Sequence, residues 1–386
     1  MNVPKLRFEE FKNEWQAKNL YEVVSFSKGN LLSKTDLDKN GLYPCILYGQ
    51  LYTKYREVIR DVFARTNNNS KNITRSKYGD VLIPSSGETP IDISTSSCIL
   101  QDDVLLGGDI NVLSPLNCDG RFISYMINNN KKTEIAKIAQ GHSIVHLYND
   151  NLKVVNLNIP EIDEQEKIAN TLELLDKKIE LQSRKIEDLK LFKLSLREKL
   201  FYMFPTDNKK LSEILIKWNK KNKANKYSYV ESVSNKFGFI AQNEQFEDRN
   251  IASNDTSNYY VIEKGVFAYN PSRLNVGSLA LKQNDKISLV SPLYECFTTN
   301  QNQDFMLEWF QSKEFRRGTF SKYEGGVRNT LNFNNLSSIE INLPSIESQN
   351  KIVKVLSCYN KLIYLELAKL NKLQELKRGL MQQLFV

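Results

Sequence analysis

The sequence predicts an α+β protein built by internal duplication, with two globular domains separated by two long helices that pair as a coiled coil. Three observations lead to this prediction. A segment of about 60 residues recurs at a constant offset of 184 residues, each copy ends in a heptad pattern of apolar residues, and short β-rich runs divided by turn-forming residues precede both patterns. Each copy of the pseudo-twofold duplication therefore consists of a globular part and a helical part.

Length and composition are those of an ordinary globular protein. The chain has 386 residues, which at roughly 150 residues per domain allows two or three domains. Hydrophobic residues make up 41% and charged residues 25%, values typical of a packed core with a hydrated surface. No stretch approaches the ~18 uncharged apolar residues of a membrane span, and Met1–Glu10 lacks the apolar run of a signal peptide. We therefore expect a cytoplasmic protein.

Charge and cysteine content narrow the kinds of partner and site. The formal net charge of +8 permits a polyanionic partner without demonstrating one. The five cysteines are odd in number, far apart and include no C-x-x-C pair: Cys45, Cys98, Cys118, Cys296 and Cys358. This spacing argues against a zinc site and against a disulfide framework, so we expect buried free thiols in a reducing compartment.

The repeat is clearest where each helical part begins. Pro160-x-Ile162-x-x-Gln165-x-Lys167-Ile168 returns as Pro344-x-Ile346-x-x-Gln349-x-Lys351-Ile352. In both copies a proline and an acidic first turn precede the heptads, as is usual where α-helices begin. The predicted boundaries are a first globular domain at 1–157, a first helical region at 158–204, a second globular domain at 205–341 and a second helical region at 342–386.

Both helical regions carry apolar residues at steps of alternately four and three, the 3.5-residue period of a coiled coil. No Pro or Gly interrupts the first region between Asp163 and Phe204, so this helix is expected to run roughly 60 Å. The predicted coiled-coil residues are Ile168, Leu172, Leu175, Ile179, Ile186, Leu189, Leu196 and Leu200 in the first helix and Ile352, Leu356, Tyr359, Ile363, Leu370, Leu373, Leu380 and Leu384 in the second.

Polar residues interrupt the two heptad patterns at equivalent positions, Gln182 with Glu366 and Lys193 with Lys377. Polar residues at core positions usually fix the register of a coiled coil. One antiparallel register places Lys193 opposite Glu366 and Gln182 opposite Lys377. A register shifted by one heptad overlaps the helices more fully but leaves those pairs unmatched. The sequence does not choose between these registers, and it leaves open that the four residues are solvated and have no partner.

The regions before the helices are predicted to be α+β domains of about 140 to 160 residues. Runs with β character occur at Tyr43–Tyr48, Asp80–Pro84 and Gly265–Tyr269, and Gly, Asn, Ser and Pro separate them. Short helices are expected late in each domain, at Phe122–Asn129 and Phe305–Lys313.

Two glycines at equivalent places, Gly141 and Gly325, each precede a short segment that leads into the next strand. Glycine at such a place permits a positive φ or a close approach of another backbone. A loop that faces DNA and a plain turn both fit this pattern.

Polar, basic and aromatic side chains are interleaved in the loops of both domains. Lys and Arg neutralise phosphates, whereas Arg, Asn and Gln form paired hydrogen bonds with base edges, so this composition suits a DNA-binding surface. A single loop of this kind is more often an ordinary hydrated surface, but its presence in both copies of the duplication favours DNA binding. The candidate DNA-binding residues are Tyr48, Gly49, Gln50, Tyr52, Thr53, Lys54, Arg56, Arg75, Lys77, Ser85, Ser86 and His142 in the first domain and Lys221, Lys223, Tyr227, Asn270, Ser272, Arg273, Arg317, Lys322, Arg328 and Asn329 in the second.

Motifs that would indicate catalysis are absent from the sequence. There is no phosphate-binding loop, no dinucleotide-binding glycine turn and no H-E-x-x-H motif. His142 and His146 lie four residues apart without a nearby cysteine cluster, so no metal site is predicted. Asn270-Pro271-Ser272-Arg273 superficially resembles the N-P-P-aromatic motif of amino-methyltransferases, but it lacks the second proline and the aromatic residue. We therefore predict no catalytic residue.

The chain as a whole resembles the specificity subunit of Type I restriction–modification systems. The resemblance rests mainly on the two copies of the Pro-x-Ile-x-x-Gln-x-Lys-Ile motif, each leading into a long helix. Weaker marks are Leu20-Tyr21-Glu22-Val23 against Leu211-Ser212-Glu213-Ile214 at the start of each domain, and the run Tyr48–Thr53, which is similar to sequences in target-recognition domains.

The resemblance implies two target-recognition domains in pseudo-twofold relation, each reading one half of an asymmetric bipartite DNA site. It implies that the two helices pair as an antiparallel spacer that sets the gap between the half-sites. It further implies that two methyltransferase subunits, which bind S-adenosylmethionine and methylate adenine, dock on the helices. Up to two restriction subunits, which use ATP and Mg, can join them. On this basis the subunit itself holds no cofactor or metal and catalyses nothing.

Two other classes of function are weighed against this one. An autonomous DNA methyltransferase or nuclease is disfavoured by the missing cofactor and catalytic motifs. A coiled-coil interaction protein without a nucleic-acid role is compatible with the heptads but leaves the basic and aromatic loops unexplained. The sequence predicts neither the bases of either half-site nor the length of the gap.

Overall fold

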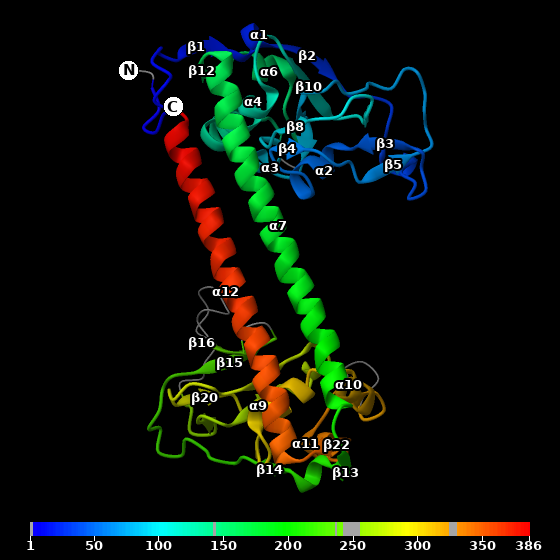
Figure 1. The fold of residues 1–386 in the computed structure, drawn as a ribbon, viewed down its shortest axis with the longest axis vertical. Coiled ribbons are helices and arrows are strands. Elements are labelled where there is room, and N and C mark those ends of the chain that lie inside the picture. Colours follow the sequence, from blue (N-terminus) through cyan, green and yellow to red (C-terminus); the bar gives the residue numbers. More distant parts are fainter. Residues whose placement is uncertain (1–2, 142–143, 236–237, 242–254, 324–329) are drawn as a thin grey trace. The chain divides into compact units, whose positions relative to one another are not determined.

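The computed structural model describes residues 3–141, 144–235, 238–241, 255–323 and 330–386 (Figure 1). The chain divides into two compact units. The first comprises Met1–Arg184 with Leu367–Val386, and the second comprises Lys185–Glu366. The long helices α7 (Ile162–Phe201) and α12 (Ile346–Leu384) each contribute one part to each unit. Every unit therefore contains one globular domain and one pair of helical segments.

The first unit combines mixed sheets with short helices. A five-stranded sheet has the order β2-β10-β6-β8-β4, and a three-stranded sheet has the order β5-β3-β9. Its strands are β1 (Gln16–Asn19), β2 (Val24–Lys28), β3 (Tyr43–Ile46), β4 (Val58–Ile59), β5 (Ala64–Thr66), β6 (Val81–Pro84), β7 (Ser86–Gly87), β8 (Ser97–Ile99), β9 (Leu105–Leu106), β10 (Ile110–Pro115), β11 (Val145–His146) and β12 (Asn156–Ile159). Its short helices are α1 (Leu20–Val23), α2 (Tyr48–Thr53), α3 (Pro90–Ile93), α4 (Gly120–Met126), α5 (Lys132–Ile138) and α6 (Asn149–Lys153).

The second unit is organised around a four-stranded sheet of order β14-β21-β18-β19. Its strands are β13 (Thr206–Lys210), β14 (Leu215–Lys217), β15 (Glu231–Ser234), β16 (Gly238–Ala241), β17 (Tyr260–Ile262), β18 (Phe267–Tyr269), β19 (Leu279–Leu281), β20 (Ser288–Val290), β21 (Glu295–Thr299) and β22 (Glu340–Pro344). Its short helices are α9 (Gln303–Trp309), α10 (Lys313–Phe320) and α11 (Phe333–Ser337).

The duplication is visible in the strand that enters each domain. β1 pairs antiparallel with β12, and β13 pairs antiparallel with β22, so in both units the entering strand lies beside the strand that leads into the long helix. The next residue, Leu20 or Leu211, is fully buried. Its amide donates to the carbonyl of Val155 in the first unit (2.9 Å) and of Ile339 in the second (2.8 Å). The weak sequence similarity at the start of each domain therefore corresponds to the same local structure.

Each long helix is continuous with the hydrophobic core of a domain at its N-terminal end. Ile168 and Leu172 of α7 belong to the core of the first unit, together with Met381, Leu384 and Phe385 from the C-terminal end of the chain. The equivalent residues of α12, which are Ile352 and Leu356, belong to the core of the second unit, together with Leu200 and Phe201. Burial of these apolar side chains fixes the helix ends on the domains.

The two long helices pair antiparallel in both units, as the sequence predicted (Figure 1). In the second unit Lys185 contacts Glu366 at 2.5 Å, and the rings of Phe192 and Tyr359 lie 5.4 Å apart. In the first unit Lys377 forms an ion pair with Asp176 at 2.7 Å. These contacts correspond to the register with the fuller overlap, in which the polar residues at heptad positions do not face one another.

The interpretation of those polar residues as solvated and without a partner is wrong. Lys193 forms an ion pair with Glu308 at 2.6 Å, Glu366 contacts Lys185, and Lys377 contacts two acidic residues. Gln182 is buried, with 6% of its surface exposed. The partners were missed because two of these lysines reach residues of the globular domains, which a comparison of helix with helix does not include.

The predicted coiled-coil residues are all buried or half-buried. The buried ones are Ile168, Leu172, Leu175, Ile179, Ile186, Leu200, Ile352, Leu356 and Leu384, and the half-buried ones are Leu189, Leu196, Tyr359, Ile363, Leu370, Leu373 and Leu380. The half-buried residues lie mainly toward the middle of each helix, because there only the partner helix covers them and no domain core adds to their burial.

Three local predictions differ from the structure. Tyr48–Thr53 is the helix α2 and not a loop, because Leu51 is fully buried and the side chain of Gln50 accepts from the amide of Leu47 (3.0 Å). The expected helix at Phe305–Lys313 covers the end of α9 and the start of α10, which Ser312 separates as the N-cap of α10. The expected helix at Phe122–Asn129 passes from α4 into a wider π-helical turn.

Gly141 has the positive φ that the sequence indicated, at +119°. A Cβ at this residue would lie 2.2 Å from the carbonyl oxygen of Ile144, so the backbone also approaches too closely for a side chain. The equivalent Gly325 lies outside the described residues.

Candidate nucleic-acid interface

The repeated glutamine of the sequence motif joins the long helix to the globular domain in both units. Gln165 Oε1 accepts from the amide of Asp119 (3.0 Å), and Gln165 Nε2 donates to the carbonyl of Pro160 (2.9 Å). Gln349 makes the same two contacts with Asn302 (3.0 Å) and Pro344 (2.9 Å).

Asp119 and Asn302 are the N-cap residues of the short helices α4 and α9. Only 2% of Gln165 and none of Gln349 is exposed. A primary amide provides both the donor and the acceptor that this position requires, and an aliphatic side chain would leave two buried backbone groups unpaired. The glutamine therefore orients a domain helix relative to the long helix.

A second polar contact joins both long helices to the domain, but its charges are arranged differently in the two units. In the first unit Lys377 lies between Asp176 (2.7 Å) and Glu57 (3.1 Å), and the hydroxyl of Tyr125 donates to Asp176 (2.7 Å). Burial raises the pKa of Asp176. Burial, together with the nearby carboxylate of Asp176, raises the pKa of the Tyr125 phenol, so the phenol stays protonated and donates.

In the second unit the acid lies on the domain and not on the long helix. Glu308 of α9 contacts Lys193 (2.6 Å) and Arg197 (3.5 Å), and Asn360 of α12 donates to it (3.3 Å). The first unit thus has one cation between two acids, whereas the second has one acid between two cations. The two junctions share a position in the repeat but are not interchangeable in charge.

The segment before β1 is held against the start of α7. The guanidinium of Arg7 donates two hydrogen bonds of 2.8 Å to the carboxylate of Glu164, and the indole of Trp15 donates a third at 3.3 Å. The hydrogen bonds with Glu164 raise the pKa of Arg7. The amide of Leu6 also donates to the carbonyl of Gln383 near the end of α12 (3.0 Å). The N-terminal segment therefore fastens together the ends of both long helices in the first unit.

The candidate DNA-binding residues of the first domain from Tyr48 to Arg56 lie on α2 and directly after it, and the others lie later in the chain. Thr53, Lys54, Arg56 and Lys77 are exposed, whereas Gly49, Gln50, Tyr52 and Arg75 are half-buried. Tyr48 has 36% of its surface exposed at the first turn of α2. The helix thus presents its polar side chains together, with Leu51 anchoring it in the core.

Four candidates among the described residues of this domain have side-chain partners within it, and one of them is Thr53, whose hydroxyl donates to the carbonyl of Gly49 (2.6 Å). Gln50 caps its own helix, and Arg75 donates to Asn69 (2.6 Å). Ser85 and Ser86 are both 5% exposed, and the Ser86 hydroxyl is 3.0 Å from Nδ1 of His146. Ser85 and Ser86 are therefore part of the packed interior in this structure. His142 lies outside the described residues.

In the second domain Asn270, Ser272 and Arg273 line one pocket of about 560 Å³ together with Pro271 and Leu293. The Asn270 side chain accepts from the amide of Ser272 (3.0 Å), which shapes the turn and leaves Ser272 and Arg273 exposed.

The remaining candidates of this domain do not line that pocket. Lys221 donates to the carbonyl of Asn258 (2.9 Å) and lies 3.1 Å from the centre of the Tyr260 ring, so its ammonium is already engaged. The side chains of Lys223 and Arg317 are exposed, and those of Tyr227 and Lys322 are half-buried. Arg328 and Asn329 lie outside the described residues.

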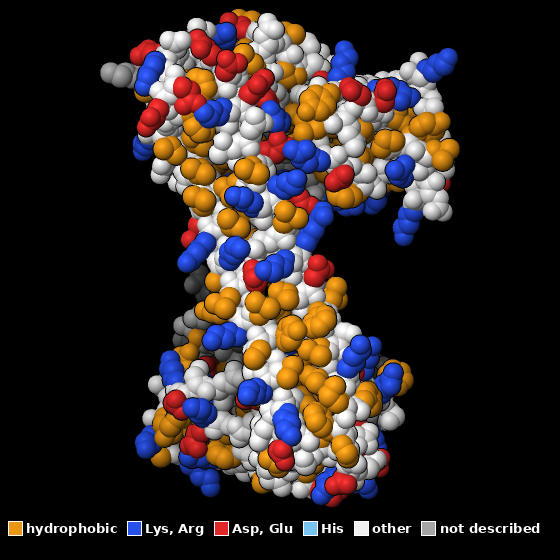
Figure 2. Space-filling view, in the orientation of Figure 1, with side chains coloured by type: hydrophobic (Ala, Val, Ile, Leu, Met, Phe, Trp, Pro, Cys, Tyr) orange, Lys and Arg blue, Asp and Glu red, His pale blue; other side chains and the backbone are white. Residues whose placement is uncertain are grey.

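An apolar surface that the heptad analysis did not include lies on the outer side of the long helices. Leu181 and Leu365, which match at the repeat offset, are 55% and 53% exposed, and the matching pair Leu376 and Phe192 are 52% and 53% exposed. Figure 2 shows hydrophobic side chains on the exposed face of the paired helices. Each unit therefore presents an equivalent apolar surface, which we call the outer helix face. The matching leucines at 181 and 365 were a sequence signal for it.

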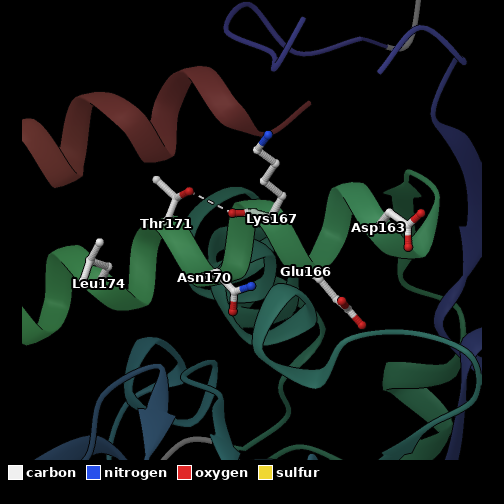
Figure 3. A pocket seen from close by; sticks show the side chains of 6 residues that line it. All are labelled: Asp163, Glu166, Lys167, Asn170, Thr171 and Leu174. Carbon is white, nitrogen blue, oxygen red and sulfur yellow. Dashed lines mark hydrogen bonds between the residues drawn. The ribbon is translucent and has the colours of Figure 1, made fainter. Parts of the chain in front are cut away.

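The first turns of α7 carry a shallow surface pocket of about 340 Å³ (Figure 3). All the residues that line it come from α7, and they are Asp163, Glu166, Lys167, Asn170, Thr171 and Leu174. The Thr171 hydroxyl donates to the carbonyl of Lys167 (2.8 Å) and so belongs to the helix itself. A pocket built from one exposed helix side has the form of a contact surface and not of an enclosed reaction site.

The described residues show no arrangement that would hold a metal ion. Within residues 3–141, 144–235, 238–241, 255–323 and 330–386, no group of three or more His, Cys, Asp or Glu side chains converges. Cys45, Cys98 and Cys296 are buried free thiols, and burial raises the pKa of Cys45 to about 11. The prediction of buried thiols is wrong for Cys358, which is exposed on α12 because it lies off the heptad core. None of the helices in the described part of the chain combines the length and apolar character needed to cross a bilayer.

Comparisons with known proteins agree with this architecture. The family model described as "Type I restriction modification DNA specificity domain" matches the chain twice, at residues 12–191 and 205–377. The fold is similar to the crystal structure of a Type I restriction–modification system S subunit from M. genitalium, with 17% identity, 100% of this chain and 99% of that chain covered, and a TM-score of 0.60. It is also similar to a chain from a study of complex assembly and conformational transition of the Type I R-M system, with 12% identity, 96% and 97% covered, and a TM-score of 0.56.

Proposed function

Because the chain belongs to the Type I restriction modification DNA specificity family, we propose that it is a non-catalytic subunit that reads an asymmetric bipartite DNA target and directs methyltransferase and restriction subunits to it. The observation that carries this proposal is the duplication. Two domains of the specificity type each follow the same local plan, from the entering strand to the buried glutamine in the first turn of the long helix. A protein with two readers fits a target with two parts.

The two readers differ in chemistry, which supports an asymmetric target. In the first domain, polar and aromatic side chains lie on the helix α2, whereas in the second Asn270, Ser272 and Arg273 lie at a pocket formed by a turn. Arg and Asn side chains can form paired hydrogen bonds with base edges, and Lys side chains can neutralise phosphates. Because these residues are not repeated at the 184-residue offset, each domain would select its own bases.

The partners would dock on the outer helix face. Leu181 with Leu376 in the first unit and Phe192 with Leu365 in the second leave apolar area in contact with water, which is unfavourable unless another protein covers it. The equal exposure at repeat-related positions supports two copies of one partner. We propose that these are adenine methyltransferase subunits, and that restriction subunits join through the assembled complex.

Cofactors would then belong to the partners and not to this chain. We propose that S-adenosylmethionine is bound by the methyltransferase subunits, and ATP and Mg by the restriction subunits. The contribution of this chain is recognition and geometry, and it would act in the cytoplasm, where DNA and the partner subunits meet.

The test is to map adenine methylation across the genome with and without the gene. One bipartite motif with two fixed half-sites and a fixed gap should disappear when the gene is removed. Exchanging residues 1–157 for the matching domain of a relative should change one half-site only. A simultaneous change of both half-sites would refute the two-reader proposal.

The same experiment separates the two other candidate functions. Methylation of DNA by the purified chain alone, without partner subunits, would establish an autonomous enzyme. An assembled complex that selects no DNA sequence would establish a coiled-coil interaction protein.

A further inference from the structure

We propose that the second unit contains a dedicated binding site for one phosphate of the DNA backbone, formed where the end of α7 meets the start of α10. This inference rests on the proposed function, because it names a place where DNA would be held. The site is a pocket of about 430 Å³ that lies wholly within the second unit. Its lining residues are Leu194, Ser195, Arg197, Glu198, Lys199, Lys313 and Arg316.

The pocket carries more positive charge than its own acid neutralises. Four of its side chains are cationic, whereas Glu198 is the single acid that lines it. Glu198 is itself engaged, since it accepts from the backbone amide of Lys313 (3.1 Å) at the start of α10. An intramolecular carboxylate therefore already occupies the N-terminus of this helix, which indicates that the region attracts negative charge.

Two guanidinium groups converge on a single acceptor at this pocket. Arg197 Nη2 donates to the carbonyl oxygen of Gln311 (2.8 Å), and Arg316 Nη2 approaches the same oxygen (3.5 Å). Like charges that share one neutral acceptor repel each other, and an anion between them would remove that repulsion. A phosphate diester offers two charged oxygens, which suit the planar array of donors on guanidinium groups.

Arg197 adds a buried cation to the exposed cations of the pocket. Its side chain is 3% exposed, and its Nε has no hydrogen-bond partner among the described residues. Burial lowers the pKa of Arg197, although Glu308 (3.5 Å) and Glu198 (3.8 Å) both form ion pairs with it. A buried cation with an unused donor is costly, and an anion held at the pocket would offset part of that cost.

Two of the four cations of this site have no charged counterpart in the first unit. At the repeat offset, Arg197 and Lys199 correspond to Met381 and Gln383, which carry no charge. The charge is therefore not a by-product of the coiled coil, whose pattern both copies share. The exposed side chain of Arg317 follows Arg316 on α10, so one further cation is available beside those of the pocket. Several neighbouring cations suit the repeated phosphates of a duplex better than one carboxylate of a partner protein.

The test uses the chain assembled with its methyltransferase subunits and a fluorescent duplex that carries the mapped target, with a scrambled duplex beside it. The variant is Lys313→Gln with Arg316→Gln, both exposed at the pocket mouth. The control is Lys210→Gln with Lys264→Gln, which removes the same charge from exposed positions of the same unit that do not line the pocket. Affinity is measured by anisotropy between about 50 and 200 mM salt.

Loss of one phosphate contact should weaken binding of both duplexes alike, by about 5- to 10-fold near 0.1 M salt, and reduce the salt slope by about 0.9 relative to the control. An unchanged slope would overturn the proposal. So would normal DNA binding combined with weaker assembly, which would identify an acidic side chain of a partner as the occupant. Equal affinity of the unaltered complex for both duplexes would refute the proposed sequence reading, while the slope would still decide the phosphate site.

Discussion

Replacing Gln349 with methionine should destabilise the second unit much more than replacing an exposed glutamine. Methionine has nearly the same length but can neither donate to the carbonyl of Pro344 nor accept from the amide of Asn302. Gln349 also donates to the side chain of Gln301 (2.9 Å). Because Gln349 is fully buried, no water can replace it without rearrangement.

The size of the effect follows from the number of groups left unpaired. An unpaired buried donor or acceptor costs about 1–3 kcal/mol, and two backbone groups lose their partner, so we expect a loss of about 2–6 kcal/mol. A change of this size should lower the melting temperature of a unit of this length by about 4–24 °C. Gln165→Met should have a similar effect on the first unit, because the geometry is the same.

The assay is urea-induced unfolding followed by circular dichroism, with differential scanning calorimetry as a second measurement. Gln374→Met is the matched control, since Gln374 is exposed on α12. The control should change the free energy of unfolding by less than about 0.5 kcal/mol. If Gln349→Met behaved like the control, the glutamine would not be the link between domain and helix, and the motif would need another explanation.

Three further predictions concern the core, the pH dependence and the spacer. Leu356→Ala should lower the free energy of unfolding by about 2–5 kcal/mol, because Leu356 is 1% exposed. Leu365→Ala, on the outer helix face, should leave urea unfolding nearly unchanged and should weaken binding of the partner in sedimentation experiments. Burial raises the pKa of Asp80, so its ionised form is disfavoured in the folded state. Asp80→Asn should therefore be more stable than the unaltered chain at pH 7. This difference in stability should disappear as the pH falls below the ordinary aspartate pKa of about 4. A stability difference that stayed constant from pH 3 to 8 would contradict this account of Asp80. Inserting seven residues at matched points in α7 and α12 adds about 10 Å to each helix. The gap in the methylated motif should then lengthen by about three base pairs, and both half-sites should stay unchanged. Methylation mapping measures both, and an altered half-site with an unchanged gap would contradict the prediction.

Duplication and helix pairing could be predicted from the sequence because both depend on periodic or repeated residues. The heptads that include Ile168 and Ile352 predict that one side of each long helix is buried. The repeat itself places Gln165 and Gln349 at the same structural position. The register could not be predicted. The two lysines at heptad positions, Lys193 and Lys377, are paired with Glu308 and Glu57, which belong to the globular domains and come close to them only in the folded chain.

The candidate binding surface was predictable by composition but not by position. The run at Tyr48 contains residues typical of a loop, and the burial of Leu51 makes it a helix. Ser85 and Ser86 are hydrophilic in sequence, yet both are packed in the interior next to His146. Conversely, Arg197 occurs in a helix of ordinary charged residues, and its burial results from packing against α9 and the residues that follow it. Tertiary contacts determine all three, and these leave no local signal in a single sequence.

The contribution of Leu367–Val386 to the first unit limits how early the first domain can fold during translation. The first unit includes Leu367–Val386, so the earliest domain to leave the ribosome still lacks Leu384 and Phe385 of its core and the carbonyl of Gln383 that receives the amide of Leu6. Translation must pass Phe385 before that domain can bury these surfaces. A nascent chain would therefore wait with an incomplete first domain, and loss of residues 367–386 would damage the first domain as well as the helix α12.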